Sequence, residues 1–280
     1  MPKISVIGIC GNSIFMQVDN FHQSGETVVA RSCFEEIGGK GINQAVAAAR
    51  MGGDVSFLAA IGDDVDGKKC IAAARENGIN GCFAVSKGKR TTFAFILTDS
   101  NGENRVTEYV GAELRPEDVL AFEEQIAKSD ILLLQQEVPP EVNEKAVEIA
   151  EKHGVKVILN PAPIRDIPNN IAEKVFLVTP NAHEREGIKH LTFRNCITTL
   201  GGDGCSINDT DFVKALPVTA VDTTGAGDTF NGILAVCLAE GMDMKTACRY
   251  AVTGSGISVT RRGVLASIPK RDEIERMVKK

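Results

Sequence analysis

Residues 222–230 read Asp-Thr-Thr-Gly-Ala-Gly-Asp-Thr-Phe and lead directly into a run of apolar residues. That run predicts a helix beginning at this segment. The small residues Gly225, Ala226 and Gly227 allow backbone N–H groups to converge at the helix N-terminus, where free donors and the helix dipole attract an anion such as a phosphate. Asp228 would then lie beside the anion and could accept a hydroxyl proton. The segment predicts phosphoryl transfer, although a tight turn before a helix gives the same pattern.

A second glycine-containing segment, Gly38-Gly39, also leads into a predicted helix. It places Lys40 and Asn43 one turn apart, where both side chains could reach the hydroxyl groups of a sugar. The segment is not a Walker A phosphate loop, because Gly41 follows the lysine where Ser or Thr would be needed for magnesium. A glycine turn with a solvated lysine is the alternative interpretation.

These two segments must be positioned by the elements around them, and short β-rich runs alternate with helical patterns through most of the chain. Strands are predicted at 4–9, 55–60, 131–135, 155–159 and 175–179, and helices at 42–51, 68–77, 116–128 and 141–153. The alternation predicts an α/β fold with a mostly parallel central sheet and helices on both faces. Helices at 226–240, 244–259 and 271–279 would complete a single domain over residues 1–280.

Two places lack intervening helices. Residues 27–34 are strand-like, and so are 92–98 and 105–110, which are joined through the turn residues Asp-Ser-Asn-Gly at 99–102. We therefore predict a small antiparallel sheet contributed by about residues 14–36 and 91–111. Such a sheet could close over a ligand as a lid and exclude water from phosphoryl transfer.

Composition excludes several other classes of function. The net charge of -6 disfavours a nucleic-acid partner, which would need clustered basic residues. No stretch approaches the roughly 18 apolar residues of a membrane span, and the N-terminal apolar run is too short for a signal peptide. The 8 cysteines form no C-x-x-C pair, which is typical of reduced thiols. We expect a cytoplasmic protein without a membrane or nucleic-acid partner.

Taken together, the two glycine-containing segments resemble the two signatures of the ribokinase-like (PfkB) carbohydrate kinases. The resemblance continues in the same order along nearly the whole chain, through Gly25-Glu26, Ile61-Gly62-Asp63-Asp64, Gln136-Glu137, Asn160-Pro161-Ala162-Pro163, and residues 179–184 and 199–204. An ordered set of motifs is far more specific than any one of them. The resemblance implies a three-layer αβα fold with a small β lid, and ATP-dependent phosphorylation of a hydroxyl group on a sugar or sugar-like molecule.

The resemblance also implies a role for each matching position. Asp228 would be the catalytic base, and Gly225, Ala226 and Gly227 would form the anion hole. The sugar would be held by Gly39, Lys40, Asn43 and Glu137, together with Ser13. ATP would contact Asn181, Thr199, Gly201 and Gly204, and Glu184 would act indirectly on Mg²⁺.

Two further properties of the family extend to this chain as expectations. Many members use a monovalent cation next to the anion hole, and the residues at the matching positions are Asp222, Thr224, Gly263 and Ser267. Potassium is therefore a candidate cofactor beside Mg²⁺ and ATP. Many members also pair through their lids, which makes a homodimer a candidate assembly.

The chain departs from the family in two places. Family members usually carry an Asn-x-Asp pair after the first strand, whose Asp binds two sugar hydroxyls, but this chain has Gly11 and Ser13 there. A hydroxyl accepts fewer hydrogen bonds than a carboxylate, so a ribose-like diol would bind more weakly unless Asn12 or another group substitutes. In addition, only 18 positions separate Asn181 from Thr199. Family members commonly have a further helix and the start of a strand in this segment, so either it is shorter in this chain or residues are missing from the sequence.

Three alternatives therefore stay open. A nucleoside kinase or a phosphosugar kinase of the same family would suit a changed acceptor, and a phosphosugar would require basic side chains near the lid, for which Lys87, Lys89 and Arg90 are candidates. A sugar or nucleotide sensor with the kinase fold but no turnover is the third. A nicotinamide-dependent oxidoreductase is disfavoured because the chain has no G-x-G-x-x-G motif after its first strand.

Overall fold

The computed structural model describes residues 1–101 and 103–279, so Gly102 of the predicted turn lies outside the described residues. Its centre is a six-stranded sheet in which every neighbouring pair is parallel. In sheet order the strands are β10 (Leu177–Val178), β9 (Lys156–Asn160), β8 (Ile131–Gln135), β1 (Lys3–Ile7), β4 (Asp54–Gly62) and β5 (Asn80–Ser86). The predicted parallel sheet is confirmed, and β5 is a strand that sequence analysis did not predict.

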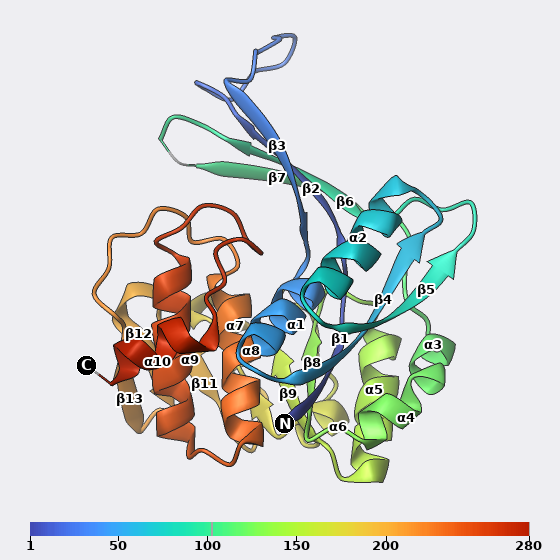
Figure 1. The fold of residues 1–280 in the computed structure, drawn as a ribbon, viewed down its shortest axis with the longest axis vertical. Coiled ribbons are helices and arrows are strands. Elements are labelled where there is room, and N and C mark those ends of the chain that lie inside the picture. The colour runs from blue at the N-terminus through green and yellow to red at the C-terminus, as the bar shows by residue number, and fades with distance from the viewer. Residues whose placement is uncertain (102, 280) are drawn as a thin grey trace.

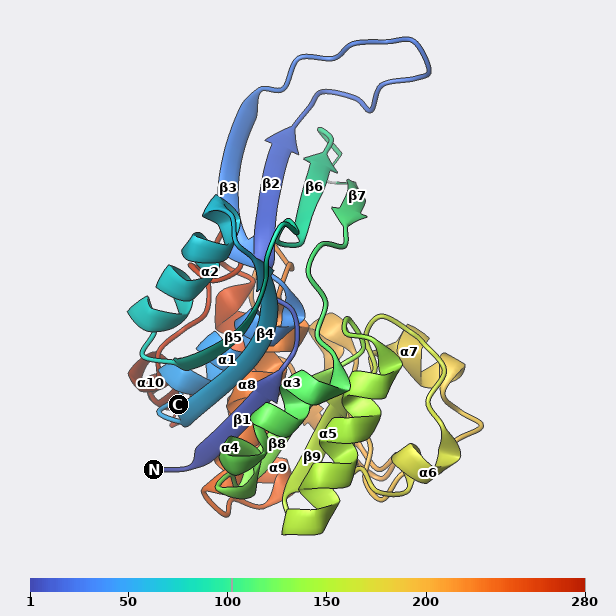
Figure 2. The ribbon, with the colours of Figure 1, turned by 90° about the vertical axis from the view of Figure 1, so that its right-hand side faces the viewer.

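Helices cover both faces of this sheet, which gives the three layers visible in Figures 1 and 2. Side chains alternate between the faces along each strand: Leu133 of β8 belongs to one buried cluster and Leu134 to the other. The first cluster includes side chains of α1 (Lys40–Arg50), α2 (Val65–Glu76), α8 (Ala226–Ala239), α9 (Met244–Ser258) and α10 (Arg271–Val278). The second includes α3 (Pro116–Ala121), α4 (Glu123–Ala127), α5 (Pro140–His153) and α6 (Asn169–Ala172).

The predicted helices are present with small shifts of their ends, except that the helix expected over 116–128 is divided into α3 and α4. Among the described residues, no helix has both the length and the apolar character required to cross a membrane.

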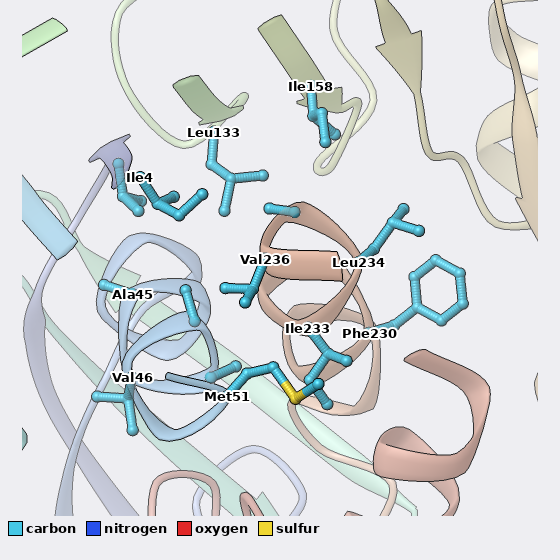
Figure 3. Packing of buried hydrophobic residues seen from close by; sticks show 14 of the residues in the cluster. Ile4, Ala45, Val46, Met51, Leu133, Ile158, Phe230, Ile233, Leu234 and Val236 are labelled. Atoms are coloured by element: carbon cyan, nitrogen blue, oxygen red, sulfur yellow. The ribbon is translucent and has the colours of Figure 1, made fainter. Parts of the chain in front are cut away.

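The packing of α1 against α8 fixes the position of both motif segments. Figure 3 shows Val236 of α8 pointing toward α1, and Met51, directly after α1, reaching toward Ile233, below the sheet residues Ile4 and Leu133. The two helices come very close at Gly232, where a Cβ atom would lie 2.5 Å from the Gln44 carbonyl oxygen. Because nothing larger than glycine fits there, the N-terminal ends of α1 and α8 are held together.

A four-stranded sheet projects from the main domain and forms the lid (Figures 1 and 2). Its order is β3 (Ser32–Gly38), β2 (Gly11–Gln17), β6 (Phe93–Thr98) and β7 (Asn104–Tyr109). The β3–β2 and β6–β7 pairs are antiparallel, whereas β2 and β6 run in parallel through its centre.

The strand predicted at 27–34 is largely wrong. Residues 27–31 are not in a strand, and β3 begins only at Ser32. The reason is the length of the neighbouring strand: β2 ends at Gln17, whose carbonyl oxygen accepts a hydrogen bond from the Arg31 N–H at 2.7 Å. Beyond this point the β-branched residues of the predicted strand have no partner, so they continue as a loop.

A third, antiparallel sheet contains β11 (Ile197–Thr199), β12 (Gly204–Ile207) and β13 (Asp211–Lys214). The short connection before it contains only α7 (Ala182–Gly187) and turns. Ile188 and Leu191 in this connection are buried in the second cluster, so the segment closes the main domain despite its length.

Candidate active site

Asp228 lies in the first turn of α8 with 6% of its surface exposed. Gly225 caps the helix with a left-handed φ of 73°, and a Cβ atom there would lie 2.6 Å from the Val264 side chain. A residue larger than glycine would therefore be strained both by conformation and by contact. Asp228 therefore lies within one turn of the helix start, where the sequence predicts an anion hole.

Amide groups from α1 hold both oxygens of the Asp228 carboxylate. Asn43 Nδ2 donates to Oδ2 at 2.9 Å, and Gln44 Nε2 donates to Oδ1 at 3.1 Å. Gln44 is in turn fixed by Gln135, whose Nε2 donates to the Gln44 Oε1 at 2.8 Å. Sequence analysis predicted Asn43 but missed both glutamines. A signal was available for Gln44, because a polar residue precedes four apolar residues that are all buried in α1.

The N-terminus of α1 brings Lys40 and Glu137 together. The Lys40 backbone N–H donates to the Glu137 Oε2 at 2.8 Å. Gly39 precedes it with a φ of 110°, in close contact with the Ile9 carbonyl, so this position also requires glycine. Asp228 is the main cause that raises the pKa of Lys40. Burial raises the pKa of Glu137 to about 7, although Lys40 acts in the opposite direction.

A cavity of about 320 Å³ lies between the lid and the main domain. The predicted sugar-site residues all line it, namely Ser13, Gly39, Lys40, Asn43 and Glu137. Asp228 and Gly225 form part of the same wall. The structure therefore brings together side chains from β2, from α1, from the end of β8 and from α8, at the carboxyl ends of the parallel strands, where α/β folds commonly bind ligands.

A second cavity of about 300 Å³ lies on the other side of the α8 N-terminus. Thr199, Gly201 and Gly204 line it together with Ala226 and Gly227, and apolar side chains such as Leu216, Val218 and Phe230 cover its walls. A largely apolar cavity lined by glycines suits a nucleotide. The segment from residue 223 to residue 228 thus separates two cavities, with the Asp228 carboxylate on the side of the lid.

Asn181 and Glu184 bind each other rather than lining either cavity. The Asn181 Oδ1 caps α7 by accepting the Glu184 N–H at 2.8 Å, and the Glu184 carboxylate accepts the Asn181 backbone N–H and side-chain amide, both at 2.8 Å. The pKa of Glu184 is raised, mainly by burial. The charge of Lys40 acts to lower it, and the charge of Asp228 acts to raise it. Glu184 therefore lies within electrostatic range of the site.

The four predicted potassium-site residues lie on two loops that meet beside the α8 N-terminus. The Asp222 carboxylate accepts hydrogen bonds from the Thr224 N–H at 3.0 Å and the Gly263 N–H at 3.3 Å. The buried Ser267 hydroxyl donates to the Val264 carbonyl at 2.8 Å. The structure places the loops together as the resemblance implied, but Asp222 and Ser267 serve as links within them.

Comparison with known proteins decides the family. The sequence matches the pfkB family carbohydrate kinase profile over residues 1–271. The chain belongs to this family. The PfkB chain is 34% identical over 294 aligned residues to a ribokinase of Bacillus subtilis, covering 99% of this chain and 100% of the relative. Its fold resembles a crystal structure of ribokinase from Thermotoga maritima with a TM-score of 0.90 and 34% identity, covering 100% of both chains. It also resembles Arabidopsis thaliana ribokinase complexed with ribose and ATP, with a TM-score of 0.87 and 26% identity over 100% of this chain and 99% of the other.

Family membership confirms the predicted three-layer α/β fold and the predicted class of enzyme. The PfkB chain is an ATP-dependent carbohydrate kinase. The Asp228 carboxylate at the N-terminus of α8, between two cavities, is consistent with this activity.

Proposed function

We propose that this PfkB kinase transfers the γ-phosphoryl group of ATP to a primary hydroxyl of a neutral pentose such as ribose, with Asp228 as the base. One observation carries the proposal: Asp228, at the N-terminus of α8, faces the lid-covered cavity while Ala226 and Gly227 face the second one. A sugar in the first cavity and ATP in the second would place the attacking hydroxyl and the γ-phosphate on either side of one helix end.

Each residue of the site would have a separate task. Asp228 accepts the hydroxyl proton at one carboxylate oxygen, and Asn43 and Gln44 keep that carboxylate oriented. The N–H groups of residues 225–227 stabilise the charge on the transferring phosphoryl group. Lys40 and Glu137 orient the sugar, and closure of the lid excludes water, which would otherwise accept the phosphate.

Mg²⁺ would supply neutralisation of the ATP phosphates. Glu184 fits an indirect role, because each of its oxygens accepts a hydrogen bond from Asn181 and keeps a second lone pair for a metal-bound water. Thr199, Gly201 and Gly204 would contact the nucleotide, and Asn181 would contribute by holding Glu184.

The charges around the cavity favour a neutral acceptor over a phosphosugar. Lys87 and Lys89 line a different cavity. Arg90 stacks over the Phe93 ring at 4.5 Å from its centroid. Among the described residues that line the sugar cavity, Lys40 is the one basic side chain, against the three carboxylates of Glu108, Glu137 and Asp228. A sugar phosphate would meet net negative charge there, so a nucleoside kinase is the stronger alternative within the family.

The decisive experiment measures ADP formation from Mg-ATP with a panel of pentoses, hexoses, nucleosides and phosphosugars. We expect acceptor-dependent ADP formation with a pentose, and a loss of about 10²–10⁴ in kcat for Asp228→Asn. Asp54→Asn is the matched control, because Asp54 is exposed at the opposite end of the sheet. ATP binding without turnover on any acceptor would instead support the sensor alternative.

We further propose that K⁺ binds between the loops containing Thr224 and Gly263. Asp222 joins these loops, and carboxylate and carbonyl oxygens are suitable ligands for a hard monovalent cation. The test compares kcat in potassium, sodium and choline salts at one ionic strength. Equal rates in the three salts would contradict the proposal.

Assembly and location follow as the last parts of the proposal. Phe95 and Tyr109 of the lid are exposed apolar side chains on the face away from the sugar cavity, and they would be covered if two lids paired in a homodimer. Light scattering after gel filtration measures this directly, and a monomer at assay concentration would contradict it. Eight free cysteines and the use of ATP favour the cytoplasm, which fractionation of cells producing the tagged protein would test.

A further inference from the structure

The lid carries a row of four residues at one level above the sugar cavity. In the register of the sheet, Ser13 of β2 pairs with Ala94 of β6, which pairs with Glu108 of β7, and Ser13 pairs on its other side with Glu36 of β3. Residues paired across neighbouring strands project from the same face. Ser13, Ala94 and Glu108 all line the cavity, so the face they share is the one toward the sugar.

Among the described residues, the Glu108 carboxylate differs from the nearby carboxylates of Glu36 and Glu137 in having no hydrogen-bond partner. Glu36 accepts the backbone N–H groups of Val264 and Ala266 at 2.8 and 3.1 Å. Glu137 accepts the Lys40 N–H, as described above. Within residues 1–101 and 103–279, no hydrogen bond or ion pair involves the side chain of Glu108. Its four lone-pair positions are therefore free for a ligand.

The charge of Glu108 acts on the centre of the site. It raises the pKa of Lys40 and of Glu137 in addition to the larger influences on each. A carboxylate pointing into solvent on the outer face of the lid would be screened from both groups. The electrostatics thus agree with the register in placing Glu108 toward the cavity.

Space for a ligand lies between Glu108 and Ser13. Neighbouring strands are about 4.8 Å apart, so residues two strands apart are separated by about 10 Å. Ala94 between them contributes only a methyl group, which leaves room for a glutamate side chain and a pair of hydroxyl groups above the sheet.

We propose that Glu108, together with Ser13, binds two adjacent hydroxyl groups of the acceptor and so makes this kinase selective for a vicinal diol. The inference rests on the proposed sugar kinase function and names the class of acceptor. Glu108 supplies from β7 the double hydrogen-bond acceptor that the serine at position 13 lacks. A carboxylate binds two hydroxyl donors more strongly than a neutral acceptor does.

The test compares ribose with 2-deoxyribose, which differ by one hydroxyl of the diol. We expect the parent to prefer ribose, and Glu108→Gln and Glu108→Ala to lower the ratio of kcat/KM for the two sugars by about 10-fold or more. The loss should fall mainly on the KM for ribose. Glu113→Gln is the matched control, because Glu113 is an exposed glutamate outside the cavity, and it should leave the ratio unchanged.

A second variant tests whether a carboxylate at this level of the lid, rather than Glu108 itself, gives the preference for ribose. Ser13→Asp combined with Glu108→Ala returns a carboxylate to the same row from the other side, and we expect it to restore the preference for ribose. If Glu108 had only a structural role, its loss would lower kcat/KM equally for both sugars, and Ser13→Asp would not restore the preference for ribose.

The outcomes are distinguishable from failure of the proposed function. If the parent forms ADP with ribose but Glu108→Gln and Glu108→Ala leave the ribose to 2-deoxyribose ratio intact, the inference is overturned and the kinase function stands. If the parent forms no ADP with any vicinal diol, both the proposed acceptor and this inference are overturned.

Discussion

Replacing Glu137 with glutamine should remove a pH-dependent cost of folding. Burial raises the pKa of Glu137 from 4.5 to about 7 in the folded protein. Between these two values the unfolded chain has lost this proton while the folded chain keeps it, so the stability of the parent falls as pH rises. At ~1.4 kcal/mol per pH unit, the full cost of ionising the buried group is an upper value of ~3 kcal/mol. Glu137 is only half-buried beside the open cavity, so we expect about 2 kcal/mol between pH 5 and pH 8.

The assay is urea denaturation of the parent and Glu137→Gln at pH 5 and pH 8. Unfolding is best followed by circular dichroism because the chain has no Trp. The difference in the free energy of unfolding, Glu137→Gln minus parent, should be about 2 kcal/mol larger at pH 8 than at pH 5. Glu113→Gln controls for loss of a surface charge. Parallel pH curves for the parent and Glu137→Gln, or a variant that loses stability relative to the parent at pH 8, would refute the reasoning.

Two further variants test the contacts that position the site. Gln44→Met removes one amide donor from Asp228 while keeping a similar side-chain volume in α1. Steady-state kinetics should therefore show kcat about 10-fold lower with an unchanged KM for ATP. An unchanged kcat would mean that Asn43 alone orients the base. Glu36→Gln weakens the charge-assisted hydrogen bonds that the lid accepts from the Val264 and Ala266 N–H groups. The KM for the sugar should therefore rise about 5-fold or more, with a smaller change in kcat. A change confined to kcat would contradict a role of Glu36 in lid closure.

The sequence predicted those parts of the site whose chemistry is local. The helix start at Asp228 and the glycine turn before Lys40 depend on residues that adjoin one another, and the structure places both as expected. The contacts that give Asp228 its orientation are not local, because Asn43 and Gln44 lie 185 and 184 positions away in the chain. Pairing over such distances depends on the close approach of α1 and α8 at Gly232, which no local pattern encodes.

The lid was less predictable for a related reason. Gly11-Asn12-Ser13 has the composition of a turn, yet it begins β2 because β3 and β6 supply hydrogen-bonding partners on both sides. Conversely, Thr27, Val28 and Val29 have high strand propensity but no partner strand. Tertiary pairing decided both segments against their local preferences.

Register in the β6–β7 hairpin determines which side chain of β7 faces the cavity. Because side chains alternate, a slip of one residue would replace Glu108 at the cavity with Thr107 or Tyr109. Asp99 holds the register: its Oδ1 accepts the N–H groups of Asn101 and Glu103 at 2.9 and 3.0 Å, and its own N–H donates to the Glu103 carbonyl at 3.0 Å. An acceptor preference that depends on Glu108 therefore also depends on this distant turn residue. The turn residues at 99–102 identified Asp99 in the sequence, but Glu108 matches no motif from which sequence alone could have identified it.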